Sequence, residues 1–178
     1  MNYIVFDLEA TCWDIEKKMI SEVIEIGAVR LNPKMEKTGE FQMFVQPVIN
    51  PVLSPFCQKL TGIKQEQVRS AQKFPEVTRL FQEWIGDKYW LCSWGFYDRK
   101  KMKDDCILHK MPYDWTSFHI SIKHQYATLR KERPCGIIKA LRDFQWKFEG
   151  QHHRALEDAR NISRIFKAVY PALRFEKS

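Results

Sequence analysis

Two carboxylates stand two residues apart near the start of the chain. Asp7 and Glu9 stand at the end of the short apolar run Tyr3–Asp7, which is typical of a buried strand. Residues two apart on a strand point to the same face. Crowded carboxylates repel each other and lose solvation on burial, and a cation between them removes both penalties. The pattern indicates a metal site, and the simpler alternative is that both acids end the strand in solvent.

A third acid and a histidine lie near the end of the chain. Asp158 is in line with the apolar stripe of a helix predicted over 154–170. The helix dipole favours an acid in the first turn, which explains its position along the helix but not its position around it. His153 precedes it by five residues, in a predicted loop over 150–153 from which a side chain can reach a site. A lone loop histidine more often has no such role, so His153 matters only if other ligands converge on it.

A fourth acid comes from the middle of the chain. Asp98 follows a predicted strand and stands at a predicted helix start, where an aspartate is also a common N-cap. Its rivals are Asp87, Asp104 and Asp105, which we expect in more polar surroundings.

The elements that must position these residues follow from hydrophobic periodicity and turn signals. Strands are predicted at Tyr3–Asp7, Glu22–Asn32, Phe41–Val45 and Trp90–Ser93, with a hairpin connection around Asn32–Lys37. Helices are predicted from Ser54-Pro55 to about Leu60 and at Phe74–Ile85, Asp98–Lys110, Thr116–Arg130, Ile137–Phe144 and Arg154–Tyr170. Early strands followed by alternating helices favour an α/β fold with a mixed central β-sheet flanked by α-helices. The sequence has no repeat and no Gly/Ser linker, so we expect one domain over residues 1–178.

Composition bounds the class of protein. No apolar run approaches the roughly 18 residues of a membrane span, and the N-terminus has no basic region of the kind that opens a secretory signal. The five cysteines are far apart and form no CxxC pair, which disfavours a zinc site or a disulfide framework. We therefore expect no membrane association and a cytoplasmic location.

Charge is distributed unevenly along the chain. Residues 1–98 carry 11 Lys and Arg against 13 Asp and Glu, whereas residues 99–178 carry 18 against 9. A basic half suits a polyanionic partner such as nucleic acid. The alternative is a solvated surface that keeps the protein soluble.

Taken together, these motifs resemble those of the DEDDh 3′→5′ exonucleases, most closely the group of histone-mRNA and small-RNA 3′ exonucleases and their bacterial relatives. The similar segments are 6–12, 23–28, 41–68 and 148–162, while 99–133 matches weakly. The resemblance implies a ribonuclease-H-like fold, two divalent ions and hydrolysis from a free 3′ end. One departure is Tyr97, where the nearest relatives usually have Trp before the second-motif Asp.

The resemblance also implies roles for individual residues. Asp7, Glu9, Asp98 and Asp158 would hold the metal ions, and His153 would be the general base. A carboxylate site without Cys suits Mg²⁺ or Mn²⁺, and two ions about 4 Å apart can stabilise the attacking and leaving oxygens. The substrate-binding residues implied are Ala10, Thr11, Phe56, Leu60 and Tyr97. Core packing on an i, i+4 helix face is the alternative for Phe56 and Leu60.

The expected partner is nucleic acid, with single-stranded RNA 3′ ends preferred. Basic residues that could contact phosphates are Lys100, Lys101, Lys103, Arg130, Lys131 and Arg133. Three alternatives stay open: a DNA 3′→5′ exonuclease of the proofreading or repair type, a catalytically inert nucleic-acid-binding module, and a structural or regulatory partner of another protein. The sequence does not discriminate RNA from DNA, because recognition of the 2′-hydroxyl leaves no motif in it.

Overall fold

The computed structural model describes residues 1–14 and 19–173. In this part of the chain, five strands form one sheet in the order β3-β2-β1-β4-β5. The strands are β1 (Asn2–Ala10), β2 (Val23–Leu31), β3 (Lys37–Phe44), β4 (Tyr89–Ser93) and β5 (His119–Ser121). β2 pairs antiparallel with β1 and β3, whereas β1, β4 and β5 pair in parallel. The predicted mixed sheet is confirmed.

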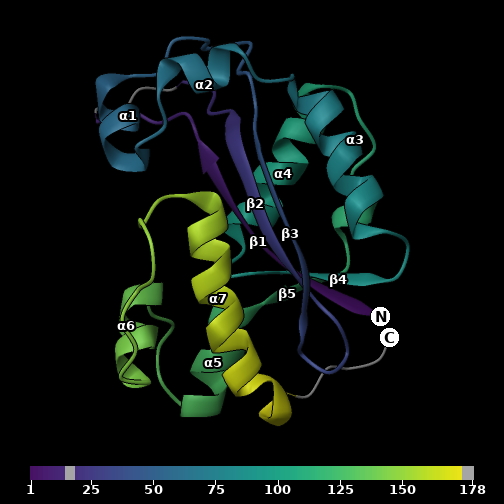
Figure 1. Cartoon of the computed structure of the whole chain (residues 1–178), viewed down its shortest axis with the longest axis vertical. Helices are drawn as coiled ribbons and strands as arrows, with labels where there is room; N and C mark the ends of the chain where they lie inside the picture. The colour runs from purple at the N-terminus through teal and green to yellow at the C-terminus, as the bar shows by residue number, and fades with distance from the viewer. Residues whose placement is uncertain (15–18, 174–178) are drawn as a thin grey trace.

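Helices surround this sheet (Figure 1). They are α1 (Pro55–Thr61), α2 (Gln65–Arg69), α3 (Phe74–Ile85), α4 (Tyr97–Leu108), α5 (Ile122–Arg130), α6 (Ile137–Asp143) and α7 (Ala155–Val169), with 3₁₀ turns at Asp114–Thr116 and Tyr170–Ala172. The predicted start and stop signals of α1 are confirmed: the Ser54 side chain accepts a hydrogen bond from the Cys57 backbone, and Gly62 ends the helix at φ 69°. Within residues 1–14 and 19–173, no helix has both the length and the apolar composition that crossing a bilayer requires.

The prediction of one helix over Thr116–Arg130 is wrong. This segment begins in a 3₁₀ turn, continues as β5 and becomes α5 only at Ile122. β5 pairs in parallel with β4, with His119 opposite Leu91. Strand pairing with a buried neighbour therefore overrides the local helical pattern. The short helix α2 is an element that the periodicity did not predict.

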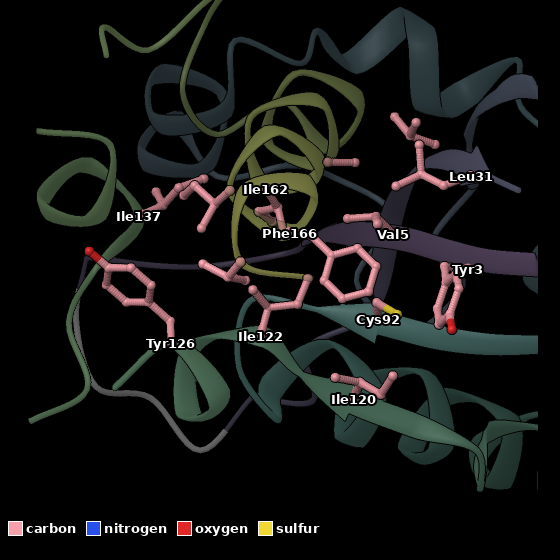
Figure 2. Close-up of a cluster of buried hydrophobic side chains, with 14 of the residues drawn as sticks. Tyr3, Val5, Leu31, Cys92, Ile120, Ile122, Tyr126, Ile137, Ile162 and Phe166 are labelled. Carbon is pink, nitrogen blue, oxygen red and sulfur yellow. The ribbon is translucent and has the colours of Figure 1, made fainter. Parts of the chain in front are cut away.

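The alternation of side chains along β1 separates two cores. Tyr3 and Val5 point to the face covered by α5, α6 and α7, as Figure 2 shows for the buried cluster around Phe166. Ile4 and Phe6 point to the opposite face, which α3 and α4 cover. Asp7 and Glu9 continue the odd-numbered series, so both carboxylates face the layer that contains α7.

α7 lies unusually close to the sheet at its amino-terminal end. Gly27, which pairs with Asp7 in the register of β1 and β2, lies directly under this end of the helix. A Cβ atom at Gly27 would lie 2.1 Å from the backbone nitrogen of Leu156. Only glycine permits this approach. Figure 1 shows α7 crossing the sheet with its first turn near the end of β1.

Candidate active site

Three carboxylates converge where the end of β1 meets the first turn of α7. Asp7, Glu9 and Asp158 each offer an oxygen, and these three oxygens lie within 4.8 Å of one another. Glu9 is 9% exposed and Asp158 is 6% exposed. β1 runs on to Ala10, so the alternative that both of its acids end the strand in solvent is wrong. The structure brings together three of the four predicted ligands.

Asp98, the fourth predicted ligand, lines the same cleft from α4. Its carboxylate accepts a hydrogen bond from the backbone nitrogen of Leu8, at 3.3 Å. Asp98 is therefore attached to β1 and is not the N-cap of its helix, a position that Phe96 occupies. It is not part of the three-oxygen group, although its charge acts on Asp7.

The electrostatics of these acids indicate a cation site. Burial, followed by repulsion from Asp98, Asp158 and Glu9, holds the pKa of Asp7 well above its usual range. The same effects raise the pKa of Glu9 to about 9, and burial raises the pKa of Asp98 to about 7 and that of Asp158 to about 6. A bound cation would offset both the lost solvation and the repulsion. Because the donors are all carboxylate oxygens, the group fits Mg²⁺ or Mn²⁺.

Two histidines lie beside Asp158. His153 has a left-handed backbone, with φ 65°, and its backbone N–H donates to Oδ2 of Asp158 at 2.8 Å. The Nε2 atom of His152 lies 3.5 Å from Oδ1 of the same carboxylate, and the two ring centroids are 4.0 Å apart. Burial lowers the pKa of both histidines, so each is neutral near pH 7 and able to accept a proton. Sequence reasoning missed His152, although its position next to His153 was a usable signal.

A buried ion pair anchors the loop that carries these histidines. Glu25 lies opposite Glu9 on β2 and is completely buried. Arg154 donates to both of its oxygens, through Nη2 at 3.0 Å and Nε at 3.1 Å. The backbone of Ala155 and the side chain of Gln42 also donate to Glu25. The pair ties the start of α7 to the sheet, and neither residue was among the predicted site residues.

The cleft above the carboxylates has a volume of about 380 Å³. Of the predicted substrate-binding residues, the structure brings Ala10, Leu60 and Tyr97 to its walls. Thr11 and Phe56 are not lining residues: the Thr11 hydroxyl accepts from the Glu22 backbone, and Phe56 lies 37% exposed on α1. The alternative for Phe56 and Leu60, core packing on one helix face, is wrong because both residues are exposed.

Two expectations about α4 and its charges need correction. Asp105 was expected in polar surroundings but is 1% exposed. Lys101, a predicted phosphate contact, is 8% exposed and forms an ion pair with Asp105 at 2.6 Å. Its amino group also donates to the Ser21 backbone carbonyl. Lys101 is thus a structural cation, whereas Lys123, which was not predicted, lines the cleft.

Comparison with known proteins places this geometry in a family. The profile of the Exonuclease (RNase_T) family matches residues 4–166. The 3′-5′ exoribonuclease 1 of Rattus norvegicus is 33% identical over 176 residues, covering 90% of this chain and 50% of that protein. ERI1 exoribonuclease 2 of Xenopus laevis is 31% identical over 195 residues, covering 91% of this chain and 27% of that protein. The chain thus spans half or less of the length of these relatives.

A solved structure extends the match to three dimensions. The nuclease domain of 3′hExo, described as a DEDDh family member bound to rAMP, superposes with a TM-score of 0.90 at 31% identity, covering 99% of this chain and 96% of that one. The predicted ribonuclease-H-like fold and the resemblance to DEDDh exonucleases are therefore confirmed. The chain belongs to the Exonuclease (RNase_T) family.

Proposed function

We propose that this protein is a metal-dependent 3′→5′ exoribonuclease that releases nucleoside 5′-monophosphates from single-stranded RNA. The observation that carries the proposal is the convergence of Asp7, Glu9 and Asp158 within 4.8 Å of one another. Asp98 and His153 line the same cleft, which completes the set of residue types that a DEDDh site needs. A cytoplasmic location remains part of the proposal.

In this proposal, Asp7, Glu9 and Asp158 hold Mg²⁺ or Mn²⁺, and Asp98 assists from α4. Two bound ions would supply charge stabilisation for the attacking and leaving oxygens of an in-line displacement. The protein's own part is to keep the carboxylates close and partly desolvated. β1 does so by presenting two acids on one face, and α7 by its close approach over Gly27.

His153 is proposed as the general base that takes a proton from the attacking water. Its lowered pKa keeps the ring neutral near pH 7, which is the form a base requires. Its backbone N–H is fixed on Asp158 at 2.8 Å, so the residue is held beside the carboxylates. His152 is the neighbouring candidate, and substitution of each histidine in turn distinguishes the two.

RNA is proposed over DNA because two relatives at 31% and 33% identity are named exoribonucleases and the similar solved nuclease domain is described as bound to rAMP. Tyr97 is 59% exposed and lines the cleft. An aromatic ring in this position can stack on a terminal base without strong sequence preference. Leu60 would form the opposing apolar wall.

The test uses a single-stranded RNA labelled at its 5′ end and a DNA of the same sequence, each incubated with Mg²⁺ or Mn²⁺. We expect a ladder that shortens from the 3′ end, faster for RNA, and that disappears in EDTA and in Asp7→Asn. Asp104→Asn, a change of an exposed carboxylate on α4, is the matched control and should stay active. Faster degradation of DNA would favour the DNA exonuclease, and no degradation of either strand would support the inert binding module.

A further inference from the structure

An aromatic side chain that the proposed function does not use is exposed at the rim of the cleft. Phe96 stands between Gly95 and Tyr97, both of which line the cleft, and its side chain is 54% exposed. It is the N-cap of α4 and Tyr97 is the first helical residue. Successive residues there are rotated by about 100°, so the two rings face different directions from adjacent positions.

Phe96 is supported from behind by a second ring. The Phe96 and His124 rings are stacked, with centroids 4.6 Å apart and planes at 27°. A hydrogen bond between Nδ1 of His124 and the Ser121 hydroxyl, at 2.6 Å, fixes the imidazole. His119 contacts Phe96 from another side, at 6.0 Å between centroids. The phenyl ring is therefore held in place while about half of it stays exposed to solvent.

Positive charge accompanies these rings. Lys123 precedes His124 and lines the cleft. Arg99 lies near His119: burial, followed by the positive charge of Arg99, lowers the pKa of His119 to about 4. In residues 1–14 and 19–173, neither Lys123 nor Arg99 forms an ion pair. Exposed rings next to unpaired cations match the surfaces on which single-stranded nucleic acids stack and run.

We infer that Phe96, backed by His124, forms a stacking platform for one base of the RNA that lies upstream of the scissile phosphate. The inference rests on the proposed function and extends it from the terminal nucleotide to the strand behind it. A single exposed phenylalanine would indicate nothing about binding. Phe96 differs because its neighbours Gly95 and Tyr97, and Lys123 beside His124, line the cleft, so the platform stands next to the cleft wall, where a strand leaving the cleft can meet it.

The test is a double-mutant cycle between protein and RNA. Binding of a labelled RNA hexamer is measured by fluorescence anisotropy in EDTA, where hydrolysis cannot interfere, with an abasic ribose placed at each position in turn. In the wild-type protein, we expect removal of the base at one upstream position to weaken binding by about 5- to 150-fold. With Phe96→Ala, intact RNA should bind more weakly by a similar factor, and removal of that base should have no further effect. Phe96→Trp should restore the dependence.

Phe118→Ala is the matched control. Phe118 is 55% exposed but lies before β5, packs on Trp90 and does not line the cleft, so its removal should leave RNA affinity unchanged. The inference is overturned if no upstream position shows coupling to Phe96, or if Phe118→Ala has the same effect. If the protein degrades RNA but shows no coupling between Phe96 and a base, the platform is rejected and the proposed function stands. If the protein shows the coupling but degrades no RNA, the hydrolytic function is rejected and the platform stands.

Discussion

Removal of Arg154 should destabilise the protein far more than removal of an ordinary surface cation. Its guanidinium donates two hydrogen bonds to Glu25, at 3.0 and 3.1 Å. Glu25 is completely buried, so Arg154→Ala leaves a carboxylate in the interior without its cation. Unpaired buried charge is among the most costly of single-residue defects.

The expected magnitude follows from what remains around Glu25. Breaking a buried pair costs about 3–5 kcal/mol. The side chain of Gln42 at 2.6 Å and the backbone of Ala155 at 3.1 Å still donate to the carboxylate, and the Arg154 side chain is 21% exposed, which lets water replace part of it. We therefore expect the lower end, about 3 kcal/mol. For a chain of this size that corresponds to a fall in Tm of about 6–12 °C.

Urea unfolding of the metal-free protein measures this change in the free energy of unfolding. Arg79→Ala is the control, since its pair with Glu83 is exposed on both sides and should contribute about 0.5 kcal/mol or less. Glu25→Gln in the Arg154→Ala background removes the buried charge and should recover part of the loss. A loss for Arg154→Ala no larger than that for Arg79→Ala would refute the reasoning, because it would mean that the pair does not anchor the start of α7.

The other predictions concern the metal site, the base and the packing of α7. Burial, followed by repulsion from neighbouring acids, raises the pKa of Glu9 to about 9, so its protonation stabilises the folded metal-free protein. This contribution to the stability of the metal-free protein should be lost as pH rises from about 4 to about 9. The difference between the Tm measured in Mg²⁺ and the Tm measured in EDTA should therefore increase with pH. His153→Ala should lower kcat by about 10²- to 10⁴-fold while His152→Ala lowers it less, and steady-state kinetics on RNA would contradict the assignment if the order were reversed. Gly27→Ala places a Cβ atom 2.1 Å from the Leu156 backbone, so the free energy of unfolding should fall by about 3 kcal/mol or more, and an unchanged midpoint in urea would disprove the close packing.

Much of the fold and of the carboxylate site could be predicted because both depend on local patterns. A period of two in β1 placed Asp7 and Glu9 on one face, and a period of 3.6 in α7 placed Asp158 on the buried stripe. Only the family resemblance, however, indicated that these segments meet. The close approach of α7 to the sheet at Gly27 brings these segments together. The residue pattern of neither segment alone predicts this approach.

Features that depend on contacts between distant segments were missed. β5 is only three residues long and exists because it pairs with β4, so local propensity favoured a helix there. Lys101 was interpreted as a surface cation. Lys101 pairs with Asp105 one helical turn away, but the segment around Ser21 and Val23, about 80 positions earlier, is what buries the pair: Lys101 donates to the Ser21 carbonyl, and Asp105 accepts from the Val23 backbone. Glu25 was not identified as a site residue for the same reason, since its partner Arg154 is 129 positions away in the sequence.

The central claim is that Asp7, Glu9 and Asp158 form a site for a divalent cation, and direct titration with Mn²⁺ tests it. Isothermal titration calorimetry of the wild-type protein should show Mn²⁺ binding that is abolished or strongly weakened in Asp7→Asn and Asp158→Asn. It should persist in Asp104→Asn, which changes an exposed carboxylate outside the cluster. Equal binding by all four proteins, with each variant shown to be folded by circular dichroism, would contradict the assignment of the metal site.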